Sequence, residues 1–178
     1  HYEHKELGYN YRMSNLLAAL GRGQLKVLDQ RVKARRKIAK RYYNAISKIN
    51  GIKFMPEAKY GRSTRWLTTL TIDSNITGIN RMQIIHELEK NNIEARPVWK
   101  PMHMQPLYNG FEYINKNKND ISKKIFECGL CLPSGSNLDK IDQDRIIEII
   151  IDNLSKIVFA QFPPLNKGNI KLKSQIDY

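Results

Sequence analysis

A long amphipathic helix near the N-terminus is the feature that most constrains how this chain folds. Ser14 is predicted to cap it, and the helix is expected to run to about Ile49, where Asn50-Gly51 ends it. Arg35 alone interrupts its heptad-spaced apolar stripe, which consists of Leu25, Leu28, Val32, Ala39, Tyr42, Ile46 and Ile49. Because a stripe of this kind usually packs within its own molecule, we expect the helix to lie against a small sheet.

The rest of the chain alternates short β-branched segments with amphipathic ones. Strands are predicted at residues 52–55, 66–73, 93–98 and 130–132, and helices at residues 80–91, 121–128 and 139–154. Residues 99–118 are expected to be irregular, with one short helical turn near Tyr108. This order predicts an α/β fold, of the α+β kind, with helices on one side of the sheet.

The expected organisation has three parts. Residues 1–50 form an interface loop and a long linking helix, residues 51–154 form a small α/β domain, and residues 155–178 form a poorly ordered tail. The composition of the 178 residues, 41% hydrophobic and 26% charged, is ordinary for a soluble domain with a real core. No apolar run approaches the roughly 18 residues of a membrane span. The N-terminus reads as neither a signal peptide nor an initiator methionine, which is expected for a fragment or a processed chain.

The two cysteines, Cys128 and Cys131, have the C-x-x-C spacing of a redox pair or of half a zinc site. No second cysteine pair and no nearby histidine cluster accompanies them in the sequence. We therefore predict buried, reduced thiols that bind no metal, and a cytoplasmic location follows from that prediction.

Positive charge is concentrated in one helical segment. Residues 22–41 hold nine lysines and arginines against a single acid, Asp29. The segment is either a nucleic-acid footprint or the solvated face of a long helix that also meets an anionic ligand. Because no nucleic-acid recognition motif accompanies the charge, the solvated face is the preferred interpretation.

Three loops with unusual composition are the candidate functional segments, since no P-loop, GxGxxG, HExxH or GxSxG motif is present. GYNYRMS, residues 8–14, places tyrosines, Asn10 and Arg12 just before a helix start, where an anion is favoured. A structural loop with a helix cap would read the same way. LPSGSN, residues 132–137, joins a strand to a helix, and its amides could hold an anion.

EARPVWKPMHMQPLY, residues 94–108, is the third loop, and three prolines fix its path. Its mixture of stacking rings, cations and an amide suits a nucleotide or a sugar. A lone histidine in such a loop can equally be a satisfied structural residue. The side chains concerned are Arg96, Trp99, Lys100, His103, Gln105 and Tyr108.

These strings, in this order, resemble the DegT/DnrJ/StrS family of sugar-nucleotide aminotransferases. HKELGYNYRMSNLLAALGRGQL resembles the stretch that follows the cofactor-lysine region of that family. IEARPVWKPMHMQPLY and GLCLPSGSNL resemble the branch that aminates UDP-linked 4-keto sugars towards bacillosamine-type diamino sugars. The resemblance covers about residues 1–154 and implies the C-terminal part of a type I aminotransferase fold that assembles as a homodimer.

The resemblance also implies roles for individual residues. Tyr9, Asn10 and Arg12 would bind the phosphate of pyridoxal phosphate, with Asn10 reaching across the dimer interface. The nucleotide-sugar would lie near Arg96, Trp99, Lys100, His103 and Tyr108. The Schiff-base lysine of the family lies upstream of the matched stretch, and no lysine here has its serine/glycine-rich context. The chain alone is therefore expected to be inactive.

The predicted reaction of the parent enzyme moves an amino group from glutamate to a UDP-linked 4-keto sugar in surface polysaccharide or glycan biosynthesis. Two alternatives come from other classes of protein. One is a non-catalytic α/β module that dimerises through its N-terminal helix, and the other is a basic nucleic-acid-binding domain.

Overall fold

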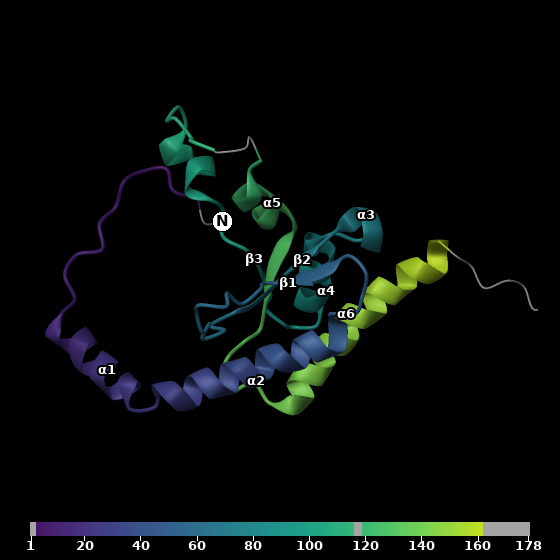
Figure 1. Cartoon of the computed structure of the whole chain (residues 1–178), viewed down its shortest axis with the longest axis horizontal. Coiled ribbons are helices and arrows are strands. Elements are labelled where there is room, and N and C mark those ends of the chain that lie inside the picture. The colour runs from purple at the N-terminus through teal and green to yellow at the C-terminus, as the bar shows by residue number, and fades with distance from the viewer. Residues whose placement is uncertain (1–2, 116–118, 162–178) are drawn as a thin grey trace, which may run out of the picture.

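The computed structural model describes residues 3–115 and 119–161, and Figure 1 shows their arrangement. The second helix runs beneath a small sheet, the first helix extends away from the sheet to one side, and the final helix lies beside the second. The helices are α1 (Asn15–Leu25), α2 (Leu28–Ile46), α3 (Ser74–Thr77), α4 (Arg81–Lys90), α5 (Ile121–Cys128) and α6 (Lys140–Gln161). The strands are β1 (Ile52–Phe54), β2 (Thr68–Ile72), β3 (Arg96–Pro97) and β4 (Gly129–Leu132), and the 3₁₀ turns are η1 (Met102–Met104) and η2 (Pro106–Tyr108).

The sheet is antiparallel throughout, with the order β1-β2-β4-β3. Its register pairs Ile52 with Ile72 and Leu70 with Leu130. Because directly paired residues of antiparallel strands point to the same side, these apolar side chains form one face. Thr69 and Cys131, which are paired with each other, point to the opposite face, and Arg96 is paired with Cys131 there.

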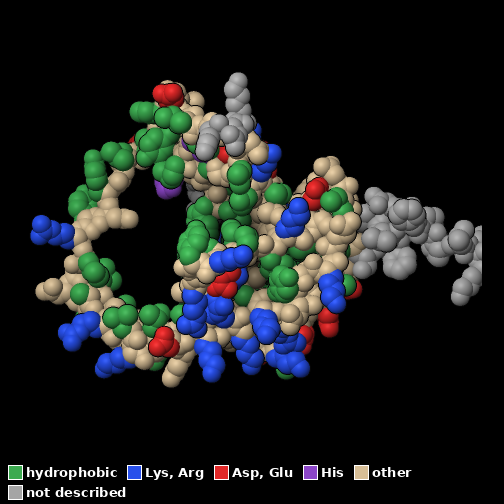
Figure 2. All heavy atoms as spheres, viewed as in Figure 1, with side chains coloured by type: hydrophobic (Ala, Val, Ile, Leu, Met, Phe, Trp, Pro, Cys, Tyr) green, Lys and Arg blue, Asp and Glu red, His purple; other side chains and the backbone are tan. Residues whose placement is uncertain are grey.

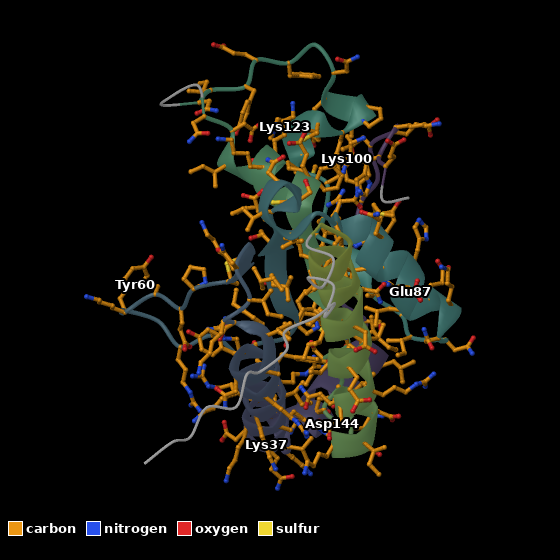
Figure 3. The ribbon with its side chains drawn as sticks, turned by 90° about the vertical axis from the view of Figure 1, so that its right-hand side faces the viewer. Lys37, Tyr60, Glu87, Lys100, Lys123 and Asp144 are labelled. Atoms are coloured by element: carbon orange, nitrogen blue, oxygen red, sulfur yellow. The ribbon has the colours of Figure 1, made fainter. Side chains whose placement is uncertain are left out.

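Helices α2, α4 and α6 cover the apolar face, and Figure 3 shows α2 and α6 side by side. Their buried side chains meet those of β1, β2 and β4 in one continuous cluster. It includes Ile38, Tyr42 and Ile46 from α2, Ile84, Ile85 and Leu88 from α4, and Ile146, Ile147, Ile150 and Leu154 from α6. The predicted α/β fold, with its helix-covered sheet, is therefore confirmed.

The predicted single N-terminal helix is wrong in one respect, because it breaks at Lys26 and Val27. The amide of Val27 bonds to the carbonyl of Gln24, which is the tighter i→i−3 pattern, and Val27 leaves helical geometry. A Cβ built at Gly21 or Gly23 would meet nothing within 4 Å, and α1 buries no residue. Helix α1 therefore lacks packing against the core that would hold it in line with α2.

The predicted apolar stripe is buried only in its second half. Tyr42 and Ile46 lie in the core, whereas Leu25 and Leu28 are 66% and 48% exposed. Ile38 is buried where the heptad reading placed Ala39. Helix α1 has no buried residue at all, so the stripe there belongs to a surface rather than to the core.

The predicted start of the N-terminal helix is confirmed, because Ser14 caps α1. The helical segment ends three residues before the predicted Ile49, since α2 stops at Ile46. Asp120 caps α5 by accepting the amide of Lys123, and Asn80 and Gln83 form a capping box at the start of α4.

Two further boundaries differ from the prediction by three residues or more. Strand β3 has two residues instead of six, because Pro97 lacks the amide needed for a longer ladder. The predicted end of α6 at Leu154 is also wrong, since the helix continues to Gln161. The rest of the predicted tail lies outside the described residues.

Candidate functional site

The candidate site is built on the face of the sheet opposite α2, α4 and α6. A pocket of about 270 Å³ opens there, between the end of β4 and the segments that enter β2 and leave β3. Arg96 and Trp99 both line it, as the sequence predicted for substrate-binding residues. Its lining also includes Trp66, Cys131 and Ser134.

Trp66 belongs to this site, but the sequence analysis did not identify it, because the pattern indicated only that Trp66 begins a strand. Its ring stacks on that of Trp99, with centroids 5.6 Å apart and an angle of 26° between the planes. The rings are 61% and 47% exposed. Arg65, which precedes Trp66, occupies the left-handed region with φ of 53°, a feature that only the structure reveals.

Two arginines fix the backbone at Trp66. Arg35, on α2, donates hydrogen bonds from its guanidinium to the carbonyl of Trp66 and to that of Ser134. Arg65 donates from its guanidinium to the carbonyl of Met55 at 2.9 Å, and its amide donates to the hydroxyl of Ser63. Arg35, which interrupts the apolar stripe of the sequence, therefore serves to join α2 to the site.

The N-terminal segment is anchored to the loop that follows β3. The amide of His4 donates to Oε1 of Gln105 at 2.9 Å, and the amide of Leu107 donates to the carbonyl of His4. Nζ of Lys100 lies 2.6 Å from a carboxylate oxygen of Glu3 and holds the pKa of that carboxyl below its usual value. The chain just before the first candidate loop is thus bonded to the loop of residues 94–108, although 101 positions separate His4 from Gln105.

The predicted phosphate-binding residues lie farther along this segment. Residues 5–14 form an arc that leaves the anchored end and returns to the body through α1, and an opening lies between arc and body (Figures 1 and 2). Within the described residues, the side chains of Tyr9, Asn10 and Arg12 make no hydrogen bond or ion pair. No acid lies in the first turn of α1, so the donors and the helix start suit an anion.

The remaining predicted substrate residues are engaged within the loop itself. Nε2 of His103 lies 2.7 Å from Asp120, and the imidazole stacks on Tyr113 with centroids 3.8 Å apart. The amide of Lys123, together with Ser122 and His103, holds the pKa of Asp120 below its usual range. Tyr108 lies in η2, half-buried. The structure therefore gives His103 a structural partner and places it outside the lining of the tryptophan pocket.

Arg96 faces two hollows. Besides the tryptophan pocket, it lines a second depression of about 610 Å³ beside α4, together with Lys100 and Arg81. Its guanidinium pairs with Glu94, which also lines both hollows. An acid thus lies beside the main cation of the site.

The candidate loop of residues 132–137 contributes Leu132, Pro133 and Ser134 to the lining of the tryptophan pocket. Ser134 is 4% exposed, and its hydroxyl donates to the carbonyl of Leu132 and accepts the amide of Thr68. The loop therefore works as a structural joint between β2 and β4 in this chain.

The two cysteines have different surroundings. Cys131 is buried in β4 at the pocket, and Cys128 ends α5, where its thiol donates to the carbonyl of Lys124. Burial raises the pKa of both thiols. Among the residues described, no group of three or more histidine, cysteine or acidic side chains is placed to hold a metal.

The arginines of the basic segment largely serve as tertiary connectors. Arg36 pairs with Glu57, Arg41 pairs with Asp144, and Arg31 donates to Ser136. Lysines and arginines gather along the outer side of α2 (Figure 2). This distribution fits the solvated-face interpretation. No helix in the described part of the chain is both long and apolar enough to cross a membrane.

Comparison with solved structures defines the class of fold. The aminotransferase TlmJ from Streptoalloteichus hindustanus superposes with a TM-score of 0.69, covering 88% of this chain and 40% of that one at 23% identity. A DegT/DnrJ/EryC1/StrS aminotransferase from Brucella abortus gives a TM-score of 0.68 at 25% identity, covering 85% of this chain and 39% of that one. The fold is therefore that of part of a sugar-aminotransferase-type chain.

Sequence comparison then identifies the family. Residues 1–151 match the DegT/DnrJ/EryC1/StrS aminotransferase family, and the chain belongs to it. It is 47% identical over 152 residues to EpsN of Bacillus subtilis, whose name assigns it to the pyridoxal phosphate-dependent aminotransferases. This match covers 85% of the chain and 38% of EpsN, so the chain spans well under half the length of the relative. GDP-perosamine synthase of Caulobacter vibrioides is 32% identical over 142 residues, covering 79% of this chain and 37% of that protein.

Proposed function

We propose that the complete protein transfers an amino group from glutamate to the 4-keto carbon of a UDP-linked sugar, using pyridoxal phosphate, for surface polysaccharide or glycan biosynthesis. One observation carries the proposal. Arg96 and Trp99, from the string that resembles the family's substrate loop, line one pocket on the sheet face opposite α2, α4 and α6, and the segment leading to Asn10 is bonded to that loop. The proposed setting is the cytoplasm.

The donor set of the N-terminal arc fits a cofactor phosphate. Asn10, Tyr9 and Arg12 provide amide, hydroxyl and guanidinium donors just before the start of α1, with no acid in its first turn. When bound, pyridoxal phosphate supplies an electron-withdrawing ring for amino transfer. The contribution of this chain is to hold the phosphate through these donors, while Arg96 and Trp99 hold the nucleotide-sugar.

A homodimer is part of the proposal. Leu16, Leu17, Leu20 and Leu25 of α1 are all at least 55% exposed, and α1 buries no residue in this chain. An apolar helix of this kind fits an interface with a second copy. In such a dimer, Asn10 would serve the cofactor of the partner subunit.

The cross-subunit role of Asn10 is tested in the complete protein. Asn10→Ala removes a hydrogen bond to a charged oxygen, worth about 1.5–3 kcal/mol, so cofactor affinity should fall roughly 10- to 150-fold. Asn44→Ala, at an exposed position of α2, is the matched control and should leave affinity unchanged. Mixed dimers of Asn10→Ala with a cofactor-lysine variant should regain activity, because one of their two sites is intact. Mixed dimers no more active than either parent would contradict the proposal.

The reaction is tested separately by supplying UDP-linked and GDP-linked 4-keto sugars with glutamate. Amination of the UDP-linked sugar is expected, and amination of the GDP-linked sugar alone would contradict the substrate class. Residues 1–178 by themselves are expected neither to form a borohydride-reducible adduct at one stoichiometric lysine nor to turn over substrate. A stoichiometric adduct together with turnover would refute that part of the proposal.

A further inference from the structure

The tryptophan pair has two properties that packing alone does not explain. Trp66 and Trp99 are large aromatic side chains, yet about half of each surface remains exposed. Neither indole N–H has a hydrogen-bond partner among the described residues. Paired, half-exposed indoles beside a cation are typical of a surface that receives another flat ring.

The backbone that presents Trp66 is held in a costly conformation. Arg65 has φ of 53°, a left-handed geometry that is unfavourable for a non-glycine residue and persists where surrounding contacts impose it. Here Glu57 lies 3.8 Å from its guanidinium, and Met55 and Ser63 accept its hydrogen bonds. The carbonyl of Trp66 is then fixed by Arg35.

Trp99 is fixed by a different set of contacts. The amide of Val98 bonds to Gly129 of β4, and Pro101 follows closely. The carbonyl of Lys100 accepts a hydrogen bond from Gln105. Hydrogen bonds therefore fix the backbone at both tryptophans. This reduces the conformational entropy that is lost when a ligand stacks on the indoles.

We propose that the Trp66–Trp99 pair is the platform on which the base of a nucleoside diphosphate stacks. This rests on the proposed function, which makes the ligand a sugar nucleotide. The pocket of about 270 Å³ is of a size for a ring rather than a whole sugar nucleotide. Arg96, at the same pocket, provides a cation for the diphosphate, and Glu94 provides a carboxylate that can accept a ribose hydroxyl.

The tryptophan fluorescence of the chain comes from this pair alone, because Trp66 and Trp99 are the only two tryptophans of the sequence. The chain is titrated with UDP, uridine, inorganic pyrophosphate and ribose 5-phosphate while tryptophan emission is recorded. UDP and uridine should quench the emission in a saturable manner, since both carry the base. Pyrophosphate and ribose 5-phosphate, which lack it, should not.

Substitutions separate stacking from other contributions. Trp66→Leu should weaken UDP binding about 5- to 150-fold, the range expected for loss of one base–aromatic stack. Trp66→Phe keeps an aromatic face and should retain most of the affinity. Tyr60→Leu is the control, because Tyr60 is 97% exposed and lies on a loop that projects away from the body (Figure 3). It should bind UDP as the parent chain does.

Three results would overturn the proposal. The first is pyrophosphate quenching as effective as that of UDP, which would mean anion binding alone. The second is parental UDP affinity in Trp66→Leu. The third is a loss of affinity in Trp66→Phe as large as in Trp66→Leu, with an unchanged circular dichroism spectrum.

The stacking proposal and the proposed function fail separately. Aminotransfer by the complete protein without a base-dependent tryptophan response would refute the stacking platform alone. Base-dependent quenching in a protein that aminates no sugar nucleotide would refute the proposed function and leave the platform in place.

Discussion

The anchor between the N-terminal segment and the loop of residues 94–108 depends on Gln105, and replacing this residue with methionine tests how firmly the two are joined. Gln105 is 3% exposed, so its amide group is removed from water. Its Oε1 accepts the amide of His4 at 2.9 Å, and its Nε2 donates to the carbonyl of Lys100 at 3.2 Å. Methionine preserves the volume and removes both bonds.

The expected cost follows from these two bonds. Each contributes about 0.5–1.5 kcal/mol, so the variant should lose about 1–3 kcal/mol of local stability. The segment would keep the bond from the amide of Leu107 to His4 and the ion pair between Lys100 and Glu3. An exposed ion pair of this kind contributes little, because water screens it. Local opening should therefore become about 5- to 150-fold more frequent.

Amide hydrogen exchange at Leu107 measures this opening directly, because that amide is bonded to His4 across the anchor. Its exchange should accelerate by the same factor in Gln105→Met. Gln30→Met, at an exposed position of α2, is the matched control and should exchange as the parent does. Unchanged exchange at Leu107 in Gln105→Met would refute the role of Gln105 as the anchor.

Three further predictions follow from individual groups. Thr68→Val should raise the free energy of unfolding by about 1–2 kcal/mol in urea titration, because Oγ1 of Thr68 is the one buried side-chain polar atom without a partner in the described residues; a lower stability would contradict this. The hydrogen bond from Arg36, aided by the amide of Ser63, lowers the pKa of Glu57 from 4.5 to about 2. Its stabilising contribution is therefore complete above pH 4.5 and is lost as the pH falls through 2, and Glu57→Gln should flatten that part of the stability profile. Cys128 and Cys131, whose pKa values burial raises, should react slowly with thiol reagents at neutral pH and carry no metal; stoichiometric zinc in the purified protein would disprove the second point.

Sequence reasoning succeeded where the information is local. The cap at Ser14 depends on a side chain and an amide three residues apart, so it is readable without any tertiary knowledge. The β-branched content of residues 66–73 likewise predicted the strand that the structure has at Thr68–Ile72. The family strings, which are long and contiguous, identified the family that the comparison confirmed.

What the sequence could not determine depends on contacts between distant segments. The heptad stripe continues through Leu25 and Leu28, but only its second half meets the sheet, so burial there was decided by where the sheet lies. For the same reason the break at Val27 was not predicted, because α1 buries no residue and only α2 is held by packing against the sheet.

The site shows the same limit most clearly. Trp66 and Trp99 lie 33 residues apart, and nothing local to either one predicts their stacking. His4 and Gln105 are separated by 101 positions. The sequence by itself determined which side chains suit a sugar nucleotide and where regular elements begin. Only the tertiary structure decided which of these side chains meet, because the antiparallel pairing of β2 and β4 and the arginine bridge from α2 bring together loops that the chain keeps far apart.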